Sequence, residues 1–285
     1  MNKIFDTIAI IGTGLIGGSM AIALKDKGLV NKIIGVDASH HNLHVALQSR
    51  IVDEIATLDE AIASADAFYV AIPVNYMVDV VKELLDKINA HQVVMDAGST
   101  KAAVCEAISA HPNRGRFVAT HPMWGTEYSG PQAAIKNAFT GRTCVICEQE
   151  KSHADALEKV KHIYSSLGMP LVYMDAINHD VHAAYVSHIS HITSFALANT
   201  VLEKEKAEQT IFELAGGGFE STVRLAKSNA AMWVPIFMQN KDNVLDVLNE
   251  HIFQLKKFKE SLEKENENYL AELIANANTI KRILG

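Results

Sequence analysis

Short runs of apolar, β-branched residues alternate with helical patterns from the start of the chain to about Asp175. Runs this short and continuously apolar are typical of strands buried on both faces of a largely parallel sheet. The segments between them, such as Gly17–Lys27 and Met77–Ile88, have helical spacing. This alternation predicts an α/β fold. The expected strands are Thr7–Ile11, Lys32–Asp37, Phe68–Ile72, Gln92–Asp96, Arg116–Thr120, Thr143–Cys147 and Leu171–Met174.

Beyond Asp175 helical patterns replace the strands, so we expect an α/β domain over residues 1–175 and an all-helical domain over 176–285. The last stretch, Asp242–Ile283, reads as one long helix whose apolar residues recur at alternating spacings of about three and four. Such a stripe fits either a seam between subunits or a face packed within its own domain. The earlier expected helices are His179–Glu203, Ala207–Leu214, Phe219–Ser228 and Ala230–Asn240.

Composition narrows the class of protein. The chain has 285 residues, of which 48% are hydrophobic, and this length allows two domains with sizeable cores. Its 26 basic and 33 acidic residues give a net charge of -7, which argues against a nucleic-acid partner. No secretory signal and no apolar run long enough to cross a bilayer is visible, so we expect a cytoplasmic protein that does not bind membranes.

The three cysteines do not form a disulfide framework. Cys144 and Cys147 have the spacing of a redox pair, but they lie on an expected strand, where residues three apart point to opposite faces. We therefore interpret both as small core residues.

A glycine-rich loop follows the first expected strand and opens a helix, in the pattern G-x-G-x-x-G. Gly12 permits the tight turn, Gly14 lets the backbone approach a pyrophosphate, and Gly17 allows close packing of the helix on the strand. The helix N-terminus then faces the phosphate charge. The alternatives are a plain glycine turn or a site for another nucleotide, but the full strand–loop–helix context favours a dinucleotide.

Asp37 ends the second expected strand, where a carboxylate accepts hydrogen bonds from the adenosine ribose and repels a 2′-phosphate. No arginine follows it, so the sequence predicts NAD rather than NADP. The expected cofactor-binding residues are Gly12, Gly14, Leu15, Ile16, Gly17, Asp37 and Ser99.

Polar residues follow two later strands. Ser99 comes after the strand ending at Asp96, and His121 comes directly after Thr120. Ligands of open α/β sheets bind outside the carboxyl ends of the strands, so both side chains are candidates for one crevice beside the cofactor. A neutral histidine can take a hydroxyl proton while hydride leaves the same carbon.

Four histidines between His179 and His191 suggest a metal site, but His182 and His191 fall on opposite sides of one helix and no paired carboxylates accompany them, so we expect no metal. His188 and His191 share a face, and each is either a pocket residue or a hydrogen-bonded structural histidine.

Arg224 lies on a helix that follows three consecutive glycines. Its guanidinium offers a fixed fork for a substrate carboxylate. A salt bridge to Glu220, four residues earlier, is an equally good interpretation from sequence alone.

These motifs, in this order and over nearly the whole chain, resemble the prephenate/arogenate dehydrogenase family. The resemblance rests on Gly12–Ser19, Asp96–Lys101, His121–Gly130, Ser187–His191 and Gly217–Trp233. It implies NAD-dependent oxidation of a ring hydroxyl carbon with loss of the ring carboxylate, which gives 4-hydroxyphenylpyruvate and CO2 from prephenate. It also implies a Rossmann-type domain followed by a helical domain that pairs into homodimers.

The resemblance further assigns roles to single residues. It implies that His121 draws off the hydroxyl proton, that Ser99 orients the hydroxyl and the nicotinamide, and that Arg224 holds a substrate carboxylate. The remaining substrate-binding residues that it implies are His191, Gly217, Trp233 and Thr126. Two positions depart from patterns seen in some members: Ser190 stands where they have Pro, and Ser221 where they have an Asp that can orient the arginine.

Three rival functions remain. An arogenate dehydrogenase would need to recognise an amine, for which Glu127 is a candidate carboxylate. A β-hydroxyacid dehydrogenase would need a lysine in the interdomain helix, and His179–Glu203 contains none. A non-catalytic NAD-binding protein would keep the glycine loop without needing Ser99, His121 and Arg224 together.

Overall fold

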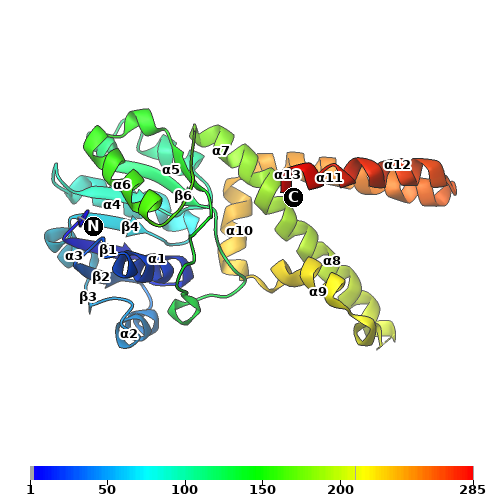
Figure 1. The fold of residues 1–285 in the computed structure, drawn as a ribbon, viewed down its shortest axis with the longest axis horizontal. Coiled ribbons are helices and arrows are strands. Elements are labelled where there is room, and N and C mark those ends of the chain that lie inside the picture. The colour runs from blue at the N-terminus through cyan, green and yellow to red at the C-terminus, as the bar shows by residue number, and fades with distance from the viewer. Residues whose placement is uncertain (1–2, 209, 285) are drawn as a thin grey trace. The chain divides into compact units, whose positions relative to one another are not determined.

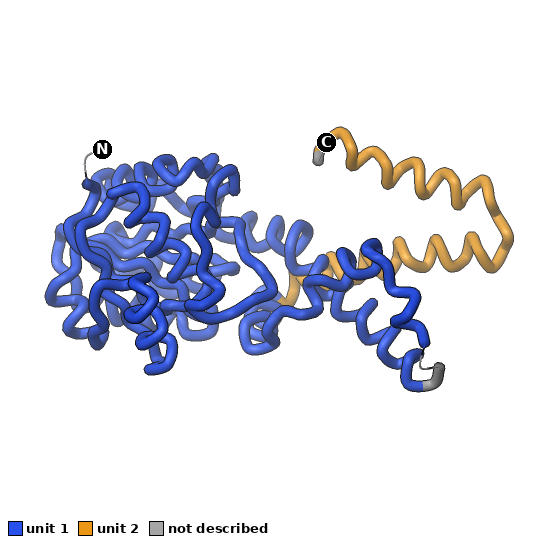
Figure 2. The backbone as a smooth tube through the Cα atoms, turned by 60° about the horizontal axis from the view of Figure 1, so that its bottom comes forward, with its two compact units in different colours: residues 1–240 blue, residues 241–285 orange. Residues whose placement is uncertain are grey.

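The computed structural model describes residues 3–208 and 210–284. Two compact units divide the chain, residues 1–240 and residues 241–285 (Figure 2). The boundary expected at Asp175 falls inside the first unit, where the Asp175 carboxylate accepts a hydrogen bond from the backbone N–H of Asn178 and caps the helix that follows.

An eight-stranded sheet forms the centre of the first unit, in the order β3-β2-β1-β4-β5-β6-β7-β8 (Figure 1). Strands β6 and β7 pair antiparallel, and the other pairs of neighbouring strands are parallel. The order reverses between β1 and β4, and open α/β sheets bind ligands at such a point of reversal. The strands are β1 (Thr7–Ile11), β2 (Lys32–Val36), β3 (Glu54–Ile55), β4 (Ala67–Val70), β5 (Val93–Asp96), β6 (Phe117–Pro122), β7 (Cys144–Cys147) and β8 (Leu171–Met174).

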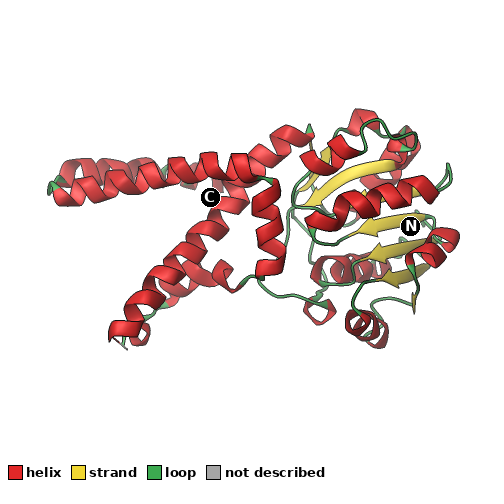
Figure 3. Ribbon diagram, turned by 180° about the vertical axis from the view of Figure 1, so that it is seen from behind, coloured by secondary structure: helices red, strands yellow, loops and turns green. Residues whose placement is uncertain are grey.

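Helices cover both faces of this sheet (Figure 3). Successive residues of β1 belong to different cores, Ile8 and Ile10 to one face and Ala9 and Ile11 to the other. This two-sided burial explains the continuous apolar runs and confirms the expected α/β class. The helices are α1 (Leu15–Asp26), α2 (His40–Gln48), α3 (Leu58–Ser64), α4 (Val74–Lys87), α5 (Ala102–Ala107) and α6 (Ala154–Ser166).

The expected strands are confirmed to within a few residues at each end. Strand β3 was not expected, because at two residues it is too short to leave an apolar run. Cys144 and Cys147 belong to the cores on opposite faces of the sheet, as expected, and burial raises the pKa of both thiols.

The last part of the first unit is helical. Helix α7 (Ala176–Ala183) passes through a π-helical turn (Ala184–His188) into α8 (Ile189–Glu208). After α9 (Gly217–Val223) and a 3-10 turn (Arg224–Lys227) comes α10 (Ala230–Gln239). Helix α10 packs on the first turn of α4, where Val74, Trp233 and Ile236 form a small core. The expected separate helix Ala207–Leu214 is wrong on its described residues: α8 runs to Glu208, and Ile211–Leu214 forms a 3-10 turn, while residue 209 lies outside the described residues.

The second unit is a helical hairpin of α11 (Lys241–Glu263) and α12 (Glu267–Asn278), followed by α13 (Lys281–Leu284). The single helix expected over Asp242–Ile283 is therefore wrong. Glu265 adopts a left-handed conformation with φ 51°, and the Asn266 side chain accepts a hydrogen bond from the backbone N–H of Tyr269 and caps α12. An asparagine at this position begins a new helix, so α11 ends before it although the apolar spacing continues across the break. Among the described residues no helix is long and apolar enough to span a membrane.

Candidate active site

The glycine loop between β1 and α1 has the geometry of a phosphate cradle. Gly12 has φ +91°, and a Cβ built there would lie 2.4 Å from the Ala71 carbonyl oxygen. A Cβ at Gly17 would lie 1.9 Å from the Gly12 carbonyl oxygen. At Gly14, in contrast, a Cβ would meet no atom within 4 Å, so space is open at the N-terminus of α1. The loop thus fits a pyrophosphate on the unpaired N–H groups of the first helical turn.

Asp37 is fixed beside this loop. One of its carboxylate oxygens accepts hydrogen bonds from the Thr13 backbone N–H, at 2.8 Å, and the Thr13 hydroxyl, at 3.0 Å. The other accepts one from the Ser39 backbone N–H at 2.8 Å. A negative charge held at the end of β2 suits ribose hydroxyls and opposes a phosphate.

A fully buried ion pair between Asp96 and Lys101 organises the loop that carries Ser99. The Asp96 carboxylate also accepts hydrogen bonds from the backbone N–H groups of Gly98, at 2.8 Å, and Thr120, at 2.9 Å. It therefore joins the end of β5 to the residue that precedes His121. A buried pair of this kind requires all its hydrogen-bonding partners, which fixes the loop geometry.

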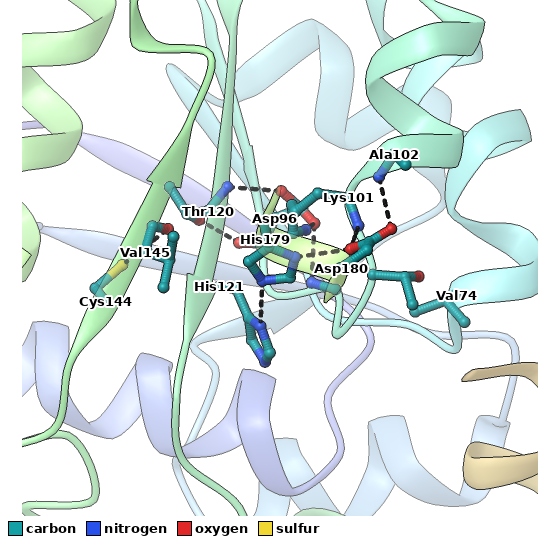
Figure 4. Close-up of polar contacts among 12 residues, drawn as sticks. Val74, Asp96, Lys101, Ala102, Thr120, His121, Cys144, Val145, His179 and Asp180 are labelled. Atoms are coloured by element: carbon teal, nitrogen blue, oxygen red, sulfur yellow. Dashed lines mark hydrogen bonds and ion pairs between the residues drawn. The ribbon is translucent and has the colours of Figure 1, made fainter. Parts of the chain in front are cut away.

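His121 ends a chain of buried hydrogen bonds (Figure 4). Its Nδ1 lies 2.8 Å from Nε2 of His179, and Nδ1 of His179 lies 2.7 Å from the Asp180 carboxylate. All three residues are at most 8% exposed. The same carboxylate accepts the backbone N–H of Lys101, at 2.7 Å, and of Ala102, at 3.0 Å.

This chain determines which nitrogen of His121 carries the proton. A carboxylate only accepts, so His179 donates from Nδ1 to Asp180, and in the tautomer that carries its hydrogen there Nε2 accepts. His121 then donates from Nδ1, which leaves its Nε2 free to accept a proton. Burial lowers the pKa of His121 well below its usual range, and the positive charges that His179, Lys101 and His188 can carry lower it further. A neutral imidazole with an available Nε2 is the form that a general base requires.

Aromatic side chains gather around Trp233, which is 6% exposed. His191 stacks on its indole with ring centroids 3.4 Å apart, and His188 meets it edge-on at 6.0 Å. The Trp233 indole N–H is buried without a hydrogen-bond partner within the described part of the chain. His188 and His191, which share a face as expected, thus both contact one predicted pocket residue.

Arg224 binds the loop that follows His121. Its Nη1 donates to the Glu127 carboxylate at 2.7 Å, so its partner is Glu127 rather than Glu220. The arginine side chain is half exposed, whereas that of Glu127 is largely covered. A hydrogen bond from its own backbone N–H and the ion pair with Arg224 both lower the pKa of Glu127. This ion pair brings Arg224, from the second half of the chain, to the loop that follows His121.

Other expected site residues are less engaged. The Thr126 hydroxyl accepts a hydrogen bond from the Tyr128 backbone N–H within a local turn, at 3.3 Å. Gly217 is the exposed first residue of α9, with open space around it. Ser99 lies half-buried in the loop after β5.

Sequence reasoning missed the supporting residues Lys101, His179 and Asp180. The one signal for them in the sequence is the adjacent pair of His179 and Asp180 at the start of an expected helix.

Protonation of the buried histidines should affect stability. Burial lowers the pKa of His188 to about 4. An unfolded histidine takes up a proton near pH 6.5, whereas the folded His188 ring stays neutral, so acid favours the unfolded chain. We expect the free energy of unfolding to fall by about 1.5 kcal/mol for His188 between pH 6.5 and pH 5, with His121 acting in the same direction. Urea unfolding at fixed protein concentration measures this, and a constant free energy over the interval would contradict it.

The doubly wound sheet, the glycine loop and the fixed Asp37 carboxylate define a Rossmann-type dinucleotide-binding protein. Comparison with known families agrees: residues 20–173 match the nucleotide-binding domain of prephenate dehydrogenase, and residues 175–276 match its dimerization domain. The chain belongs to the prephenate dehydrogenase family.

Individual relatives support this assignment. The chain is 32% identical over 273 residues to a prephenate dehydrogenase of Bacillus subtilis, with 95% of this chain and 74% of the relative covered. It is 28% identical over 271 residues to a cyclohexadienyl dehydrogenase of Zymomonas mobilis, with 94% and 92% covered. Among solved structures it resembles a prephenate dehydrogenase from A. aeolicus in complex with hydroxyphenyl propionate and NAD+, with TM-score 0.89, 29% identity and 98% of each chain covered.

Proposed function

We propose that this protein catalyses the NAD-dependent oxidative decarboxylation of prephenate to 4-hydroxyphenylpyruvate, a step of tyrosine biosynthesis. The observation that carries the proposal is the buried His121, whose proton is held on the side of His179 by the chain to Asp180. The names of the relatives from Bacillus subtilis and A. aeolicus support the substrate.

The cofactor of this proposal is NAD. Gly12, Gly14 and Gly17, with the first helical residues Leu15 and Ile16, would hold its pyrophosphate at the N-terminus of α1. Asp37 would hold the adenosine ribose, and Ser99 would lie beside the nicotinamide. When bound, NAD supplies a hydride acceptor for the substrate carbon.

The protein's own groups bind the substrate and take up one proton. His121 receives the hydroxyl proton at Nε2, and Ser99 orients that hydroxyl. Arg224 binds a substrate carboxylate through its guanidinium fork, in competition with or beside Glu127. His191, Gly217, Trp233 and Thr126 complete the pocket.

The reaction balances without any further oxidant. The hydroxyl carbon loses its hydride and the oxygen loses its proton. The bond between ring and carboxylate breaks and CO2 leaves. The electron pair of that bond completes the aromatic ring and moves the carbonyl pair onto the ring oxygen, which takes back the proton held by His121 and becomes the 4-hydroxyl group. Because aromatisation drives the step, the protein contributes positioning, charge compensation and a base.

We also propose that residues 176–285 form a domain that pairs two copies into a homodimer. The match of residues 175–276 to a dimerization domain supports this. Leu255 and Leu262 on α11 and Ile274 on α12 are at least half exposed, which is costly unless another surface covers them.

Arogenate is the second candidate substrate, because Glu127 places a carboxylate at the side of Arg224, where it can bind an amine. We expect purified protein to reduce NAD faster with prephenate than with arogenate, and faster than it reduces NADP, since Asp37 repels a 2′-phosphate. Absorbance at the reduced nicotinamide band, with both substrates and both cofactors side by side, measures this. Turnover of arogenate alone would show that arogenate, and not prephenate, is the substrate. NAD binding without any turnover would favour a non-catalytic protein.

A further inference from the structure

One glutamine amide joins α10 to two loops at the ligand edge of the sheet. The Gln239 side-chain oxygen accepts a hydrogen bond from the Thr100 hydroxyl at 2.8 Å. Its amide nitrogen donates to the Val74 carbonyl oxygen, also at 2.8 Å. Val74 begins α4 directly beyond β4, and Thr100 lies in the loop beyond β5. Both loops follow the carboxyl ends of parallel strands, where ligands of this fold bind.

The neighbouring residue fastens the other end of the same loop. The Asn240 side-chain amide is buried and donates to the Asp180 carbonyl oxygen at 2.7 Å. Asp180 in turn accepts the backbone N–H groups of Lys101 and Ala102. The loop that contains Ser99 is therefore held on its far side by residues from α7 and the end of α10.

Gln239 can be replaced without disturbing the packed core. As a whole residue Gln239 is exposed, so its replacement opens no large cavity. Thr100, in contrast, is 4% exposed, and Gln239 is the acceptor of its hydroxyl proton. The same helix carries Trp233, which packs with Val74. Gln239 thus connects the helix of the predicted substrate pocket with the loop of Ser99.

We propose that Gln239 is a positioning residue, which holds the Ser99 loop through Thr100 in the arrangement needed for hydride and proton transfer. The inference rests on the proposed function, in which Ser99 orients the reacting hydroxyl. Small displacements of a reacting group cost much of the rate, because the near-attack geometry is lost. Substrate affinity depends on Arg224 and Trp233 and stays nearly constant.

The test uses variants of both partners in the full-length protein. Gln239→Leu and Thr100→Val each lower kcat by roughly tenfold, with KM for prephenate changed by less than about twofold. The double variant is no slower than the slower single variant, because both changes remove the same interaction. Thr100→Ser keeps the hydroxyl, and its kcat stays close to that of the unaltered protein. Exposed Gln48→Leu on α2 and Thr200→Val on α8, whose hydroxyl donates to the Ala196 carbonyl oxygen of its own helix, are the control variants.

A measurement without substrate distinguishes this inference from the proposed function. Backbone hydrogen exchange of residues 96–102 becomes faster in Gln239→Leu and Thr100→Val, but not in the two controls. If exchange becomes faster in these variants but the protein oxidises neither prephenate nor arogenate, the anchoring by Gln239 is supported and the proposed function is contradicted. Unchanged exchange, additive losses in the double variant, or failure of Thr100→Ser to restore kcat would each overturn the positioning role.

Discussion

Replacement of His121 by asparagine should lower kcat by roughly 10²–10⁴-fold, the usual contribution of a general base. An asparagine amide can still donate to Nε2 of His179, so the buried hydrogen-bond chain keeps a partner while the proton acceptor is lost. NAD binding should stay close to that of the unaltered protein. Steady-state turnover with prephenate, together with a fluorescence titration of NAD, measures both effects.

The exposed His162 of α6 provides the matched control, since His162→Asn should leave kcat unchanged. The pH profile adds a second readout. Because the pKa of His121 is lowered, the acid limb of kcat/KM should lie below the usual histidine range near 6.5. A kcat within twofold of normal in His121→Asn, or an acid limb above that range, would assign the proton transfer to another group.

Replacement of Arg224 by alanine should raise the KM for prephenate by roughly ten- to a hundredfold, the value of a charge-assisted hydrogen bond to a carboxylate. The effect on kcat should be much smaller, because the carboxylate contact is made in the ground state and the transition state alike. Alanine also leaves the largely covered Glu127 without its cation.

Arg224→Lys separates charge from geometry, because lysine keeps the charge and loses the planar fork. It should recover only part of the affinity, and the exposed Arg142→Ala should change neither constant. An unaltered KM in Arg224→Ala would show that the arginine serves Glu127 alone and would remove it from the substrate site.

The sequence was sufficient for the features that depend on neighbours along the chain. The strands of the sheet are apolar because both faces are covered, and the glycine loop is a local pattern, so both could be predicted. The end of α11 could not, because its apolar spacing continues across Glu265 and only the capping Asn266 indicates the break.

The missed parts of the site depend on contacts between distant segments. His121 and His179 lie 58 residues apart, and periodicity carries no information about that pairing. Lys101 is fully buried, although a lysine is expected at the surface unless an unseen partner such as Asp96 compensates its charge. Arg224 likewise pairs with Glu127, 97 residues away in the sequence, and not with Glu220. Helical spacing indicates only the nearer carboxylate, Glu220.

The π-helical turn at Ala184–His188 changes the direction in which the side chains beyond it point from the helix. Such a turn accommodates about one more residue than an α-helical turn, and one residue corresponds to a rotation of about 100° around the axis. His179 and Asp180 lie before the turn and His191 lies after it. Without that extra residue, the His191 side chain would be turned by about 100° relative to that of His179, away from the direction in which it stacks on Trp233.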